Sequence, residues 1–248
     1  MRHEVTTVDQ LRSIVGQPND YVANKVKTRL SDAQKDWLTH SPLGFVATTD
    51  ADGRVDVSPK GDPPGFVHII DDTTIAIPER PGNKRVDGYL NVLQRPHVGT
   101  VFLIPGRGDT LRINGTATVL SDAGYFDAMI VDGKRPILAL ELAVEEVFFH
   151  CPKAFLRSDA WKPETWDPKA VPSVAQLAKA IKPDMSDEEL ETSTTRKPTC
   201  ASCSTSPASV RKVPLASGVS GTDTHARGRK HRFETDGIGN SRAQGTIP

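Results

Sequence analysis

A short basic turn near the middle of this 248-residue chain carries the clearest chemistry in the sequence. Pro81, Gly82 and Asn83 form a predicted turn that places Lys84 and Arg85 in the first turn of a short amphipathic segment. The first backbone N–H groups of a helix have no intrahelical acceptor, and the helix dipole is positive there, so this position favours an anion. The pattern therefore predicts a phosphate site. The alternative is a helix start whose charges are simply solvated.

Of these two cations, Arg85 receives the principal role. A guanidinium group can contact a phosphate through two parallel hydrogen bonds, whereas the ammonium group of Lys84 acts as a mobile point charge. Upstream, Ser58 offers a hydroxyl group and Lys60 a second cation at the end of a predicted strand. The two basic clusters flank one strand and can close on one phosphoryl group. The alternative is that Ser58 and Lys60 only end a strand.

The elements that must position these residues are mostly strands. Hydrophobic alternation and turn signals predict strands at 43–50, 54–61, 66–70, 74–78, 98–104, 109–120 and 137–150. Helical spacing predicts helices at Asp9–Gly16, Asn19–Thr39 and Asp122–Val131. The order of elements lacks the alternating rhythm of strand and helix that builds a parallel sheet. The sequence therefore predicts a mainly β (α+β) fold, an antiparallel barrel with short flanking helices.

Charge and hydropathy exclude several classes of protein. The formal net charge is zero, from 31 basic and 31 acidic residues, so a generic nucleic-acid or membrane-surface role has no electrostatic support. No apolar run is long enough to span a bilayer, and the residues after Met1 are polar where a signal peptide would be apolar. We therefore expect a cytoplasmic protein with no nucleic-acid or membrane partner.

The cysteines and histidines predict no metal site. Cys151, Cys200 and Cys203 are an odd and sparse set, unlike a disulfide framework. Cys151 is predicted to be a buried thiol. His150 and Cys151 would lie on opposite faces of a strand, which argues against joint ligation, and one C-x-x-C motif is weak support for zinc or redox chemistry. The seven histidines show no Ser/His/Asp or HExxH spacing.

The order of four segments resembles a known family. DADGRVDVSPKGDPPGFV, PERPGNKRVDGYLNVLQRPHVG, LRINGTATV and EEVFFHCPKAFLRSDAW are similar to the FMN-binding split-barrel proteins of the pyridoxamine 5′-phosphate oxidase-like superfamily, and most of all to an uncharacterised bacterial subgroup. The resemblance extends from about Leu11 to Trp166. It implies an antiparallel split β-barrel of about six to seven strands and an FMN cofactor. No G-x-G-x-x-G motif follows the first strand, which disfavours a dinucleotide fold that would bind NAD or FAD.

The resemblance also implies a division of the chain. Residues 1–40 are expected to form a helical segment packed on the barrel, 41–166 the FMN-binding domain, and 167–191 an extension with a short helix. After about Glu191 the composition shifts to Ser, Thr, Gly, Pro, Lys and Arg, and the resemblance stops. Residues 192–248 are therefore predicted to be a disordered tail.

The family suggests further site residues beyond the basic clusters. Arg112 would lie on a strand beside the flavin, although an ordinary exposed strand face is as good an interpretation. Asn91 is either a ligand or a hydrogen bonder within helix packing. The full set of expected cofactor contacts is Ser58, Lys60, Lys84, Arg85, Asn91 and Arg112, with Lys153, Arg157 and Trp161 as contacts from a partner subunit. For these last three, packing at a dimer rim is the alternative.

Homodimerisation is expected on two grounds. Split barrels of this kind hold FMN between subunits, and an open barrel seam would expose apolar faces of VGTVFLI and ILALELAV that a second copy could cover. The expected function is that of an FMN-dependent oxidoreductase, whose flavin exchanges hydride with an unidentified small substrate. The alternative is a non-enzymatic flavin- or haem-binding protein. The C-terminal Arg/His pattern of pyridoxamine 5′-phosphate oxidase itself does not occur here, and no catalytic residue is assigned.

Overall fold

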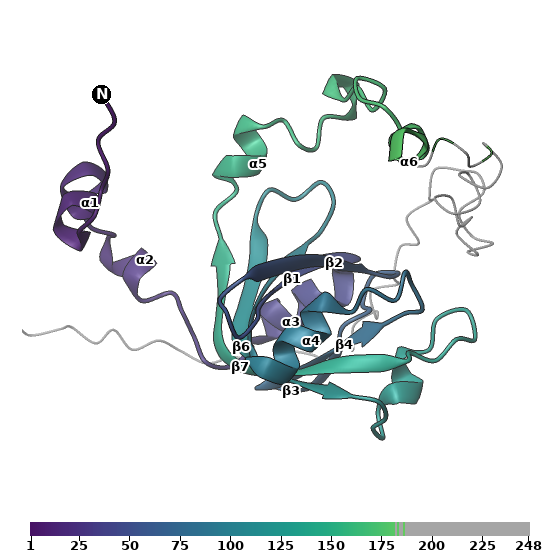
Figure 1. Ribbon diagram of the computed structural model, residues 1–248. Coiled ribbons are helices and arrows are strands. Elements are labelled where there is room, and N and C mark those ends of the chain that lie inside the picture. Colours follow the sequence, from purple (N-terminus) through teal and green to yellow (C-terminus); the bar gives the residue numbers. More distant parts are fainter. Residues whose placement is uncertain (182, 184–185, 187–248) are drawn as a thin grey trace, which may run out of the picture. The chain divides into compact units, whose positions relative to one another are not determined.

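The structure is a computed structural model that describes residues 1–181, 183 and 186 (Figure 1). Its strands are β1 (Leu43–Thr49), β2 (Val55–Gly61), β3 (His68–Asp71), β4 (Thr74–Glu79), β5 (His97–Leu103), β6 (Thr110–Leu120) and β7 (Leu138–His150). Its α-helices are α1 (Val8–Val15), α2 (Asp20–Ala23), α3 (Asp32–His40), α4 (Asp87–Gln94), α5 (Lys153–Arg157) and α6 (Val174–Ile181). Two short 3₁₀ helices are η1 (Phe126–Met129) and η2 (Pro163–Thr165).

All seven strands belong to one antiparallel sheet in the order β2-β1-β5-β6-β7-β4-β3. The Asp50–Gly53 turn joins β1 to β2 as predicted, and Gly53 adopts the positive φ of +85° that this turn requires. A single large antiparallel sheet with few helices is the mainly β split-barrel architecture expected from the sequence. Strand β2 lies at one edge of the sheet, which leaves one of its sides without a neighbouring strand.

The two longest strands, β6 and β7, run side by side (Figure 1). Their register shifts between Asn114 and Gly115, as in a β-bulge. A Cβ atom at Gly115 would lie 1.9 Å from the carbonyl oxygen of Ala143, so the backbones approach more closely than any side chain permits. The bulge in the barrel wall therefore requires glycine at this position.

The hydrophobic core takes up most of the two apolar segments that were expected at an open barrel seam. Most apolar side chains of VGTVFLI and ILALELAV turn inward and pack with residues of β1, β6 and α3, whereas Ile137, just before β7, is 50% exposed. The largest of these buried side chains include Phe102, Leu140, Leu142 and Val147. Each strand places alternate residues in the core, and the sheet curves enough to cover them within one chain. Exposed large apolar side chains remain on several elements, among them Val55 and Val57 of β2 and Leu90 and Leu93 of α4.

The predicted helix Asn19–Thr39 is wrong as one continuous element. It divides into α2 and α3, because Lys27 exchanges backbone hydrogen bonds with Val147 of β7 and leaves the helical path. A new helix then begins after Ser31, whose side chain and that of Gln34 form a capping box. Of the first three helices, only α3 buries side chains.

The predicted helix Asp122–Val131 is likewise reduced to the 3₁₀ turn η1. The residue after η1, Ile130, is extended, with φ −68° and ψ 129°, and Asp132 and Gly133 then adopt positive φ values of +49° and +71°. Extended backbone and positive φ both end a right-handed helix, so this segment folds as a compact loop between β6 and β7.

Cys151 is exposed, which contradicts the predicted buried thiol. Strand β7 ends at His150, so Cys151 stands at the beginning of a turn with Pro152 instead of inside the sheet. The predicted tail 192–248, with Cys200 and Cys203, lies outside the described residues. Within the described part of the chain, no helix combines the length and apolar character needed to cross a membrane.

Candidate functional site

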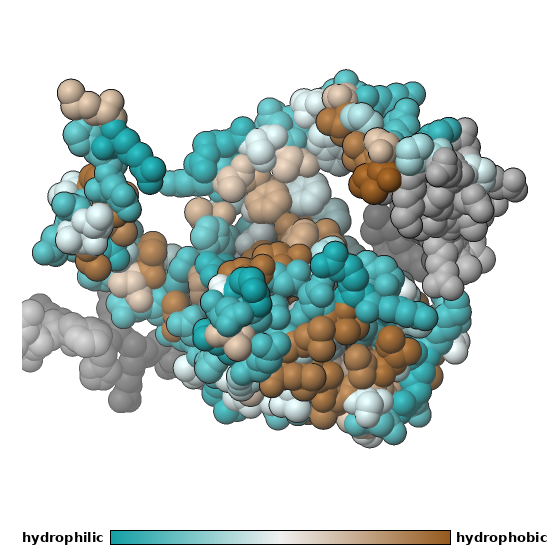
Figure 2. Space-filling view, in the orientation of Figure 1, coloured by the Kyte–Doolittle hydropathy of each residue, from teal (hydrophilic) through white to brown (hydrophobic). Residues whose placement is uncertain are grey.

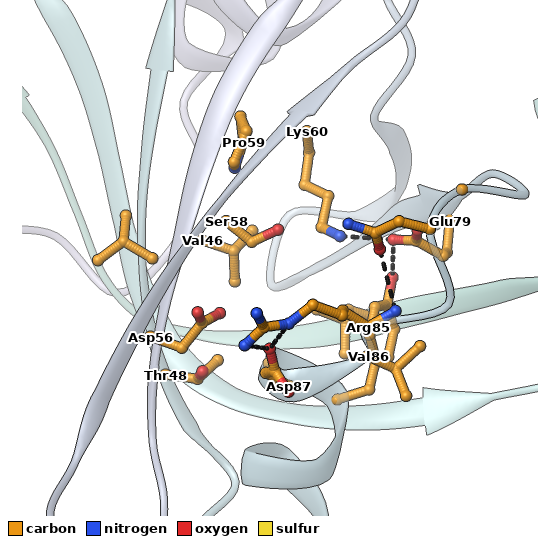
Figure 3. Close-up of a pocket in the computed structure, with 16 residues that line it drawn as sticks. Val46, Thr48, Asp56, Ser58, Pro59, Lys60, Glu79, Arg85, Val86 and Asp87 are labelled. Carbon is orange, nitrogen blue, oxygen red and sulfur yellow. Dashed lines mark hydrogen bonds and ion pairs between the residues drawn. The ribbon is translucent and has the colours of Figure 1, made fainter. Parts of the chain in front are cut away.

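A pocket of about 630 Å³ lies between β2, the end of β4 and the beginning of α4 (Figure 3). It is lined by Val46, Thr48, Asp56, Val57, Ser58, Pro59, Lys60, Glu79, Gly82, Asn83, Arg85, Val86, Asp87, Gly88, Tyr89 and Leu140. The antiparallel pairing of β1 and β2 alternates side chains along β2, so Asp56, Ser58 and Lys60 share one face. The tertiary structure thus brings together three of the predicted cofactor residues: Ser58, Lys60 and Arg85.

Lys60 is held by an ion pair inside this pocket. Its Nζ lies 2.5 Å from Oε2 of Glu79, and the two side chains are only 13% and 19% exposed. The Tyr89 hydroxyl donates to the same carboxylate at 2.7 Å, and the Lys60 ammonium lies 5.0 Å from the centre of the Tyr89 ring. Burial, together with the negative charge of Glu79, raises the pKa of Tyr89, so its hydroxyl stays protonated. Lys60, Glu79 and Tyr89 therefore form one connected cluster.

Arg85 also has a carboxylate partner, but an exposed one. Its Nε and Nη2 atoms lie 2.9 Å and 2.8 Å from Oδ2 of Asp87, and the two side chains are 77% and 43% exposed. The backbone N–H of Arg85 donates to Oδ1 of Asn83 at 2.9 Å. Helix α4 begins at Asp87, so Lys84 and Arg85 precede the first turn instead of lying within it. Lys84 has a positive φ of +65° and does not line the pocket.

The pocket carries more carboxylates than cations. Asp56, Glu79 and Asp87 line it beside Lys60 and Arg85. The side chain of Asp56 makes no hydrogen bond or ion pair within the described part of the chain, and one of its carboxylate oxygens lies 3.4 Å from where a Cβ of Gly88 would stand. None of these three carboxylates, nor Tyr89, was among the site residues expected from the sequence. Asp87 lies two residues after Arg85, so the Arg85–Asp87 pair had a local signal in the sequence. The Lys60–Glu79 pair depends on the fold.

Asn91 and Arg112 lie outside this pocket. Asn91 is buried and its side-chain amide donates to Oγ1 of Thr48 at 3.0 Å, which is the packing role considered as its alternative. The Arg112 guanidinium lies 5.0 Å from the centre of the Phe148 ring, and the Lys25 ammonium lies 5.1 Å from the same centre. Nε of Arg112 is the one buried side-chain atom without a hydrogen-bond partner among the residues described.

Lys153, Arg157 and Trp161 follow β7 and do not line the pocket of their own chain. Lys153 and Arg157 are exposed at the two ends of α5. Trp161 donates from Nε1 to the carbonyl oxygen of Arg107 at 2.6 Å and stacks on Phe155, with ring centres 5.6 Å apart. Within the residues described, no group of three or more His, Cys, Asp or Glu side chains could hold a metal ion.

A family model described as pyridoxamine 5′-phosphate oxidase matches residues 30–151. The search of curated proteins found no match. Among solved structures, the chain is similar to HupZ of Group A Streptococcus, with 22% identity over 48% of this chain and 93% of that chain and a TM-score of 0.40. It is also similar to a putative pyridoxamine 5′-phosphate oxidase from Lactobacillus delbrueckii, with 25% identity over 49% and 95% of the two chains and a TM-score of 0.38. A related FMN-binding protein from Nostoc punctiforme is 17% identical over 47% and 78%, with a TM-score of 0.33.

Proposed function

This chain belongs to the pyridoxamine 5′-phosphate oxidase family through residues 30–151, and we propose that it is an FMN-dependent oxidoreductase acting on a small substrate. The main support for this proposal is that Ser58, Lys60 and Arg85 line one pocket beside the beginning of α4. A hydroxyl group, two cations and the N–H groups of a helix start are the donors that a terminal phosphate requires.

The residues of the pocket fit the phosphate end of FMN. Its volume of about 630 Å³ lies within the range of small-molecule sites. The N–H groups of Asp87 and Gly88, the first two residues of α4, have no intrahelical acceptor, whereas the Tyr89 N–H donates to the carbonyl oxygen of Val86 at 2.9 Å. Val86, Asp87 and Gly88 line the pocket. Arg85 is exposed and can turn toward a ligand, whereas Lys60 is fixed by Glu79. Arg85 is therefore the principal phosphate contact of the proposal, with Ser58 as a hydroxyl donor.

FMN, when bound, would supply the redox chemistry by accepting and returning a hydride equivalent. The residues of this chain would hold and orient it through the phosphate, and the Lys60, Glu79 and Tyr89 cluster would keep that side of the pocket rigid. No side chain of the pocket is assigned an acid or base role in the reaction.

We further propose that the protein acts as a homodimer with the pocket near its interface. Four large apolar side chains stay exposed on the two elements that form the pocket: Val55 and Val57 of β2, and Leu90 and Leu93 of α4. Figure 2 shows apolar surface over the region where Figure 1 places α4. Exposed apolar surface on an edge strand and the helix beside it is suited to burial against a second copy.

The binding part of the proposal is tested with FMN and riboflavin, which differ only in the phosphate. Titration followed by flavin fluorescence should give a smaller dissociation constant for FMN. Arg85→Ala should weaken FMN binding at least about tenfold, which corresponds to about 1.4 kcal/mol, and should leave riboflavin binding unchanged. Arg54→Ala is the matched control, because Arg54 also pairs with aspartates but lies outside the pocket. Equal affinities for FMN and riboflavin would contradict the phosphate site.

The catalytic part is tested on the protein loaded with FMN. Reduction of the bound flavin by a nicotinamide donor, followed by reoxidation with turnover, supports an oxidoreductase. A flavin that is inert to donors indicates a binding protein instead. Light scattering across a dilution series tests the dimer, and a monomer that retains stoichiometric FMN would overturn that arrangement.

A further inference from the structure

The two cations of the pocket are both paired with carboxylates, but the two pairs differ in how tightly they are held. Lys60 and Glu79 are 13% and 19% exposed and share a third partner in Tyr89. The side chains of Arg85 and Asp87 are 77% and 43% exposed, and they form no other ion pair or hydrogen bond among the residues described. An anion that takes the Nε and Nη2 edge of Arg85, or the place of Glu79 beside Lys60, competes with the carboxylate already there.

Burial decides which pair can open. An exposed ion pair contributes little, because water solvates both charges nearly as well as they solvate each other. Opening the buried pair would leave a charge in a place that water reaches poorly, and movement of the Glu79 carboxylate would also leave the Tyr89 hydroxyl without its acceptor. An anion that enters the pocket should therefore displace Asp87 from Arg85 and leave Lys60 with Glu79.

The contact between Arg85 and Asp87 occupies the donors that a phosphate would use. Both Nε and Nη2 of Arg85 point to one oxygen of Asp87, and that carboxylate belongs to the first residue of α4, where a helix favours negative charge. We propose that Asp87 is an internal competitor of the phosphate: it holds Arg85 when no ligand is bound, and a phosphorylated ligand takes its place. This inference rests on the proposed function, since it concerns the same pocket.

Competition from Asp87 makes the pocket selective for phosphomonoesters over ligands with a single carboxylate. A ligand with a single carboxylate replaces one such contact with another of the same charge and gains little. A phosphomonoester carries nearly two negative charges at neutral pH and three acceptor oxygens, so it gains more from Arg85 than Asp87 does. Asp87 is thus a specificity-determining residue that acts through Arg85.

The test is Asp87→Asn, measured with FMN and riboflavin. The variant should bind FMN about three- to tenfold more tightly than the unaltered protein, because both the competition and the repulsion of the phosphate are removed, and its affinity for riboflavin should change less than about twofold. Asp52→Asn is the matched control. Asp52 pairs with Arg54, also two residues away and at 2.8 Å, but outside the pocket. Its FMN affinity should not change.

Three further results separate this inference from the proposed function. If Arg85→Ala weakens FMN binding but Asp87→Asn leaves it unchanged or weakens it, Asp87 does not compete with the phosphate. The proposed phosphate site is still supported in that case. If the gain from Asp87→Asn is as large in an Arg85→Ala background, Asp87 acts without Arg85, and the inference is also overturned. Equal binding of FMN and riboflavin by the unaltered protein contradicts the proposed function instead. Asp87→Ser, which also suits a helix start, serves as a second variant and should repeat the gain.

Discussion

The hydroxyl of Tyr89 donates a 2.7 Å hydrogen bond to Oε2 of Glu79. The same oxygen lies 2.5 Å from Nζ of Lys60, so one carboxylate receives two donors. The three residues come from α4, the end of β4 and the end of β2, three elements that surround the candidate site. This carboxylate therefore joins the walls of the pocket to one another.

Replacement of Glu79 should destabilise the protein. Glu79→Ala leaves the Lys60 ammonium and the Tyr89 hydroxyl without their acceptor in a place where both are poorly solvated. We expect a loss of about 1–3 kcal/mol in the free energy of unfolding, below the value for a fully buried pair because both charges keep some exposure. Urea denaturation measures it. Asp52→Asn, an exposed charge, should change stability by less than about 0.5 kcal/mol. Equal effects would show that the cluster is not structural.

Gly115→Ala should disrupt the barrel wall. Its Cβ would lie 1.9 Å from the carbonyl oxygen of Ala143, and the backbones of β6 and β7 would have to separate at the bulge. A loss of about 2–4 kcal/mol or failure to fold is expected, and thermal unfolding measures it. Gly124→Ala is the matched control, since no atom lies within 4 Å of its Cβ position. A fully stable Gly115→Ala variant would contradict the close approach of the strands.

His150 should titrate below its ordinary pKa. Burial lowers the pKa of His150 most, and the positive charges of Lys25 and Arg112 lower it further. Its pKa in the unfolded chain is about 6.5, so the protein should lose stability as the pH falls from that value through the lower folded pKa. Lys25→Met should raise the pKa of His150 in an NMR titration, whereas Lys169→Met, an exposed site, should not. An unchanged pKa in Lys25→Met would show that Lys25 is too well screened to act.

Cys151 should react with thiol reagents in the folded protein, because it is exposed. The measurement uses a Cys200→Ser, Cys203→Ser background, so that the signal comes from Cys151 alone. The rate of modification in buffer should lie within about tenfold of the rate in denaturant. Protection that disappears only on unfolding would restore the original expectation of a buried thiol.

Much of the fold could be predicted from the sequence, because its signals are local. Alternation along Leu43–Thr49 and the turn that ends in Gly53 depend on residues a few positions apart, and the hairpin forms where they indicate. The helices were less predictable. No local pattern near Lys27 predicts its backbone pairing with Val147, and this pairing divides the predicted helix Asn19–Thr39. A contact between distant residues can override local helical spacing.

The same distinction holds for the pocket. Strand and turn signals in the sequence place Ser58 and Lys60 on one strand and Arg85 in the turn before the next helix. Which charges these residues meet depends on the tertiary structure. Glu79 is 19 residues from Lys60, and β2 and β4 are separated in the sheet by other strands. Ion pairing depends on distance in space and on burial, and both are set by how the sheet curves and where α4 packs. Local spacing therefore specifies the cations, whereas the folded chain specifies which of them is free to bind a phosphate.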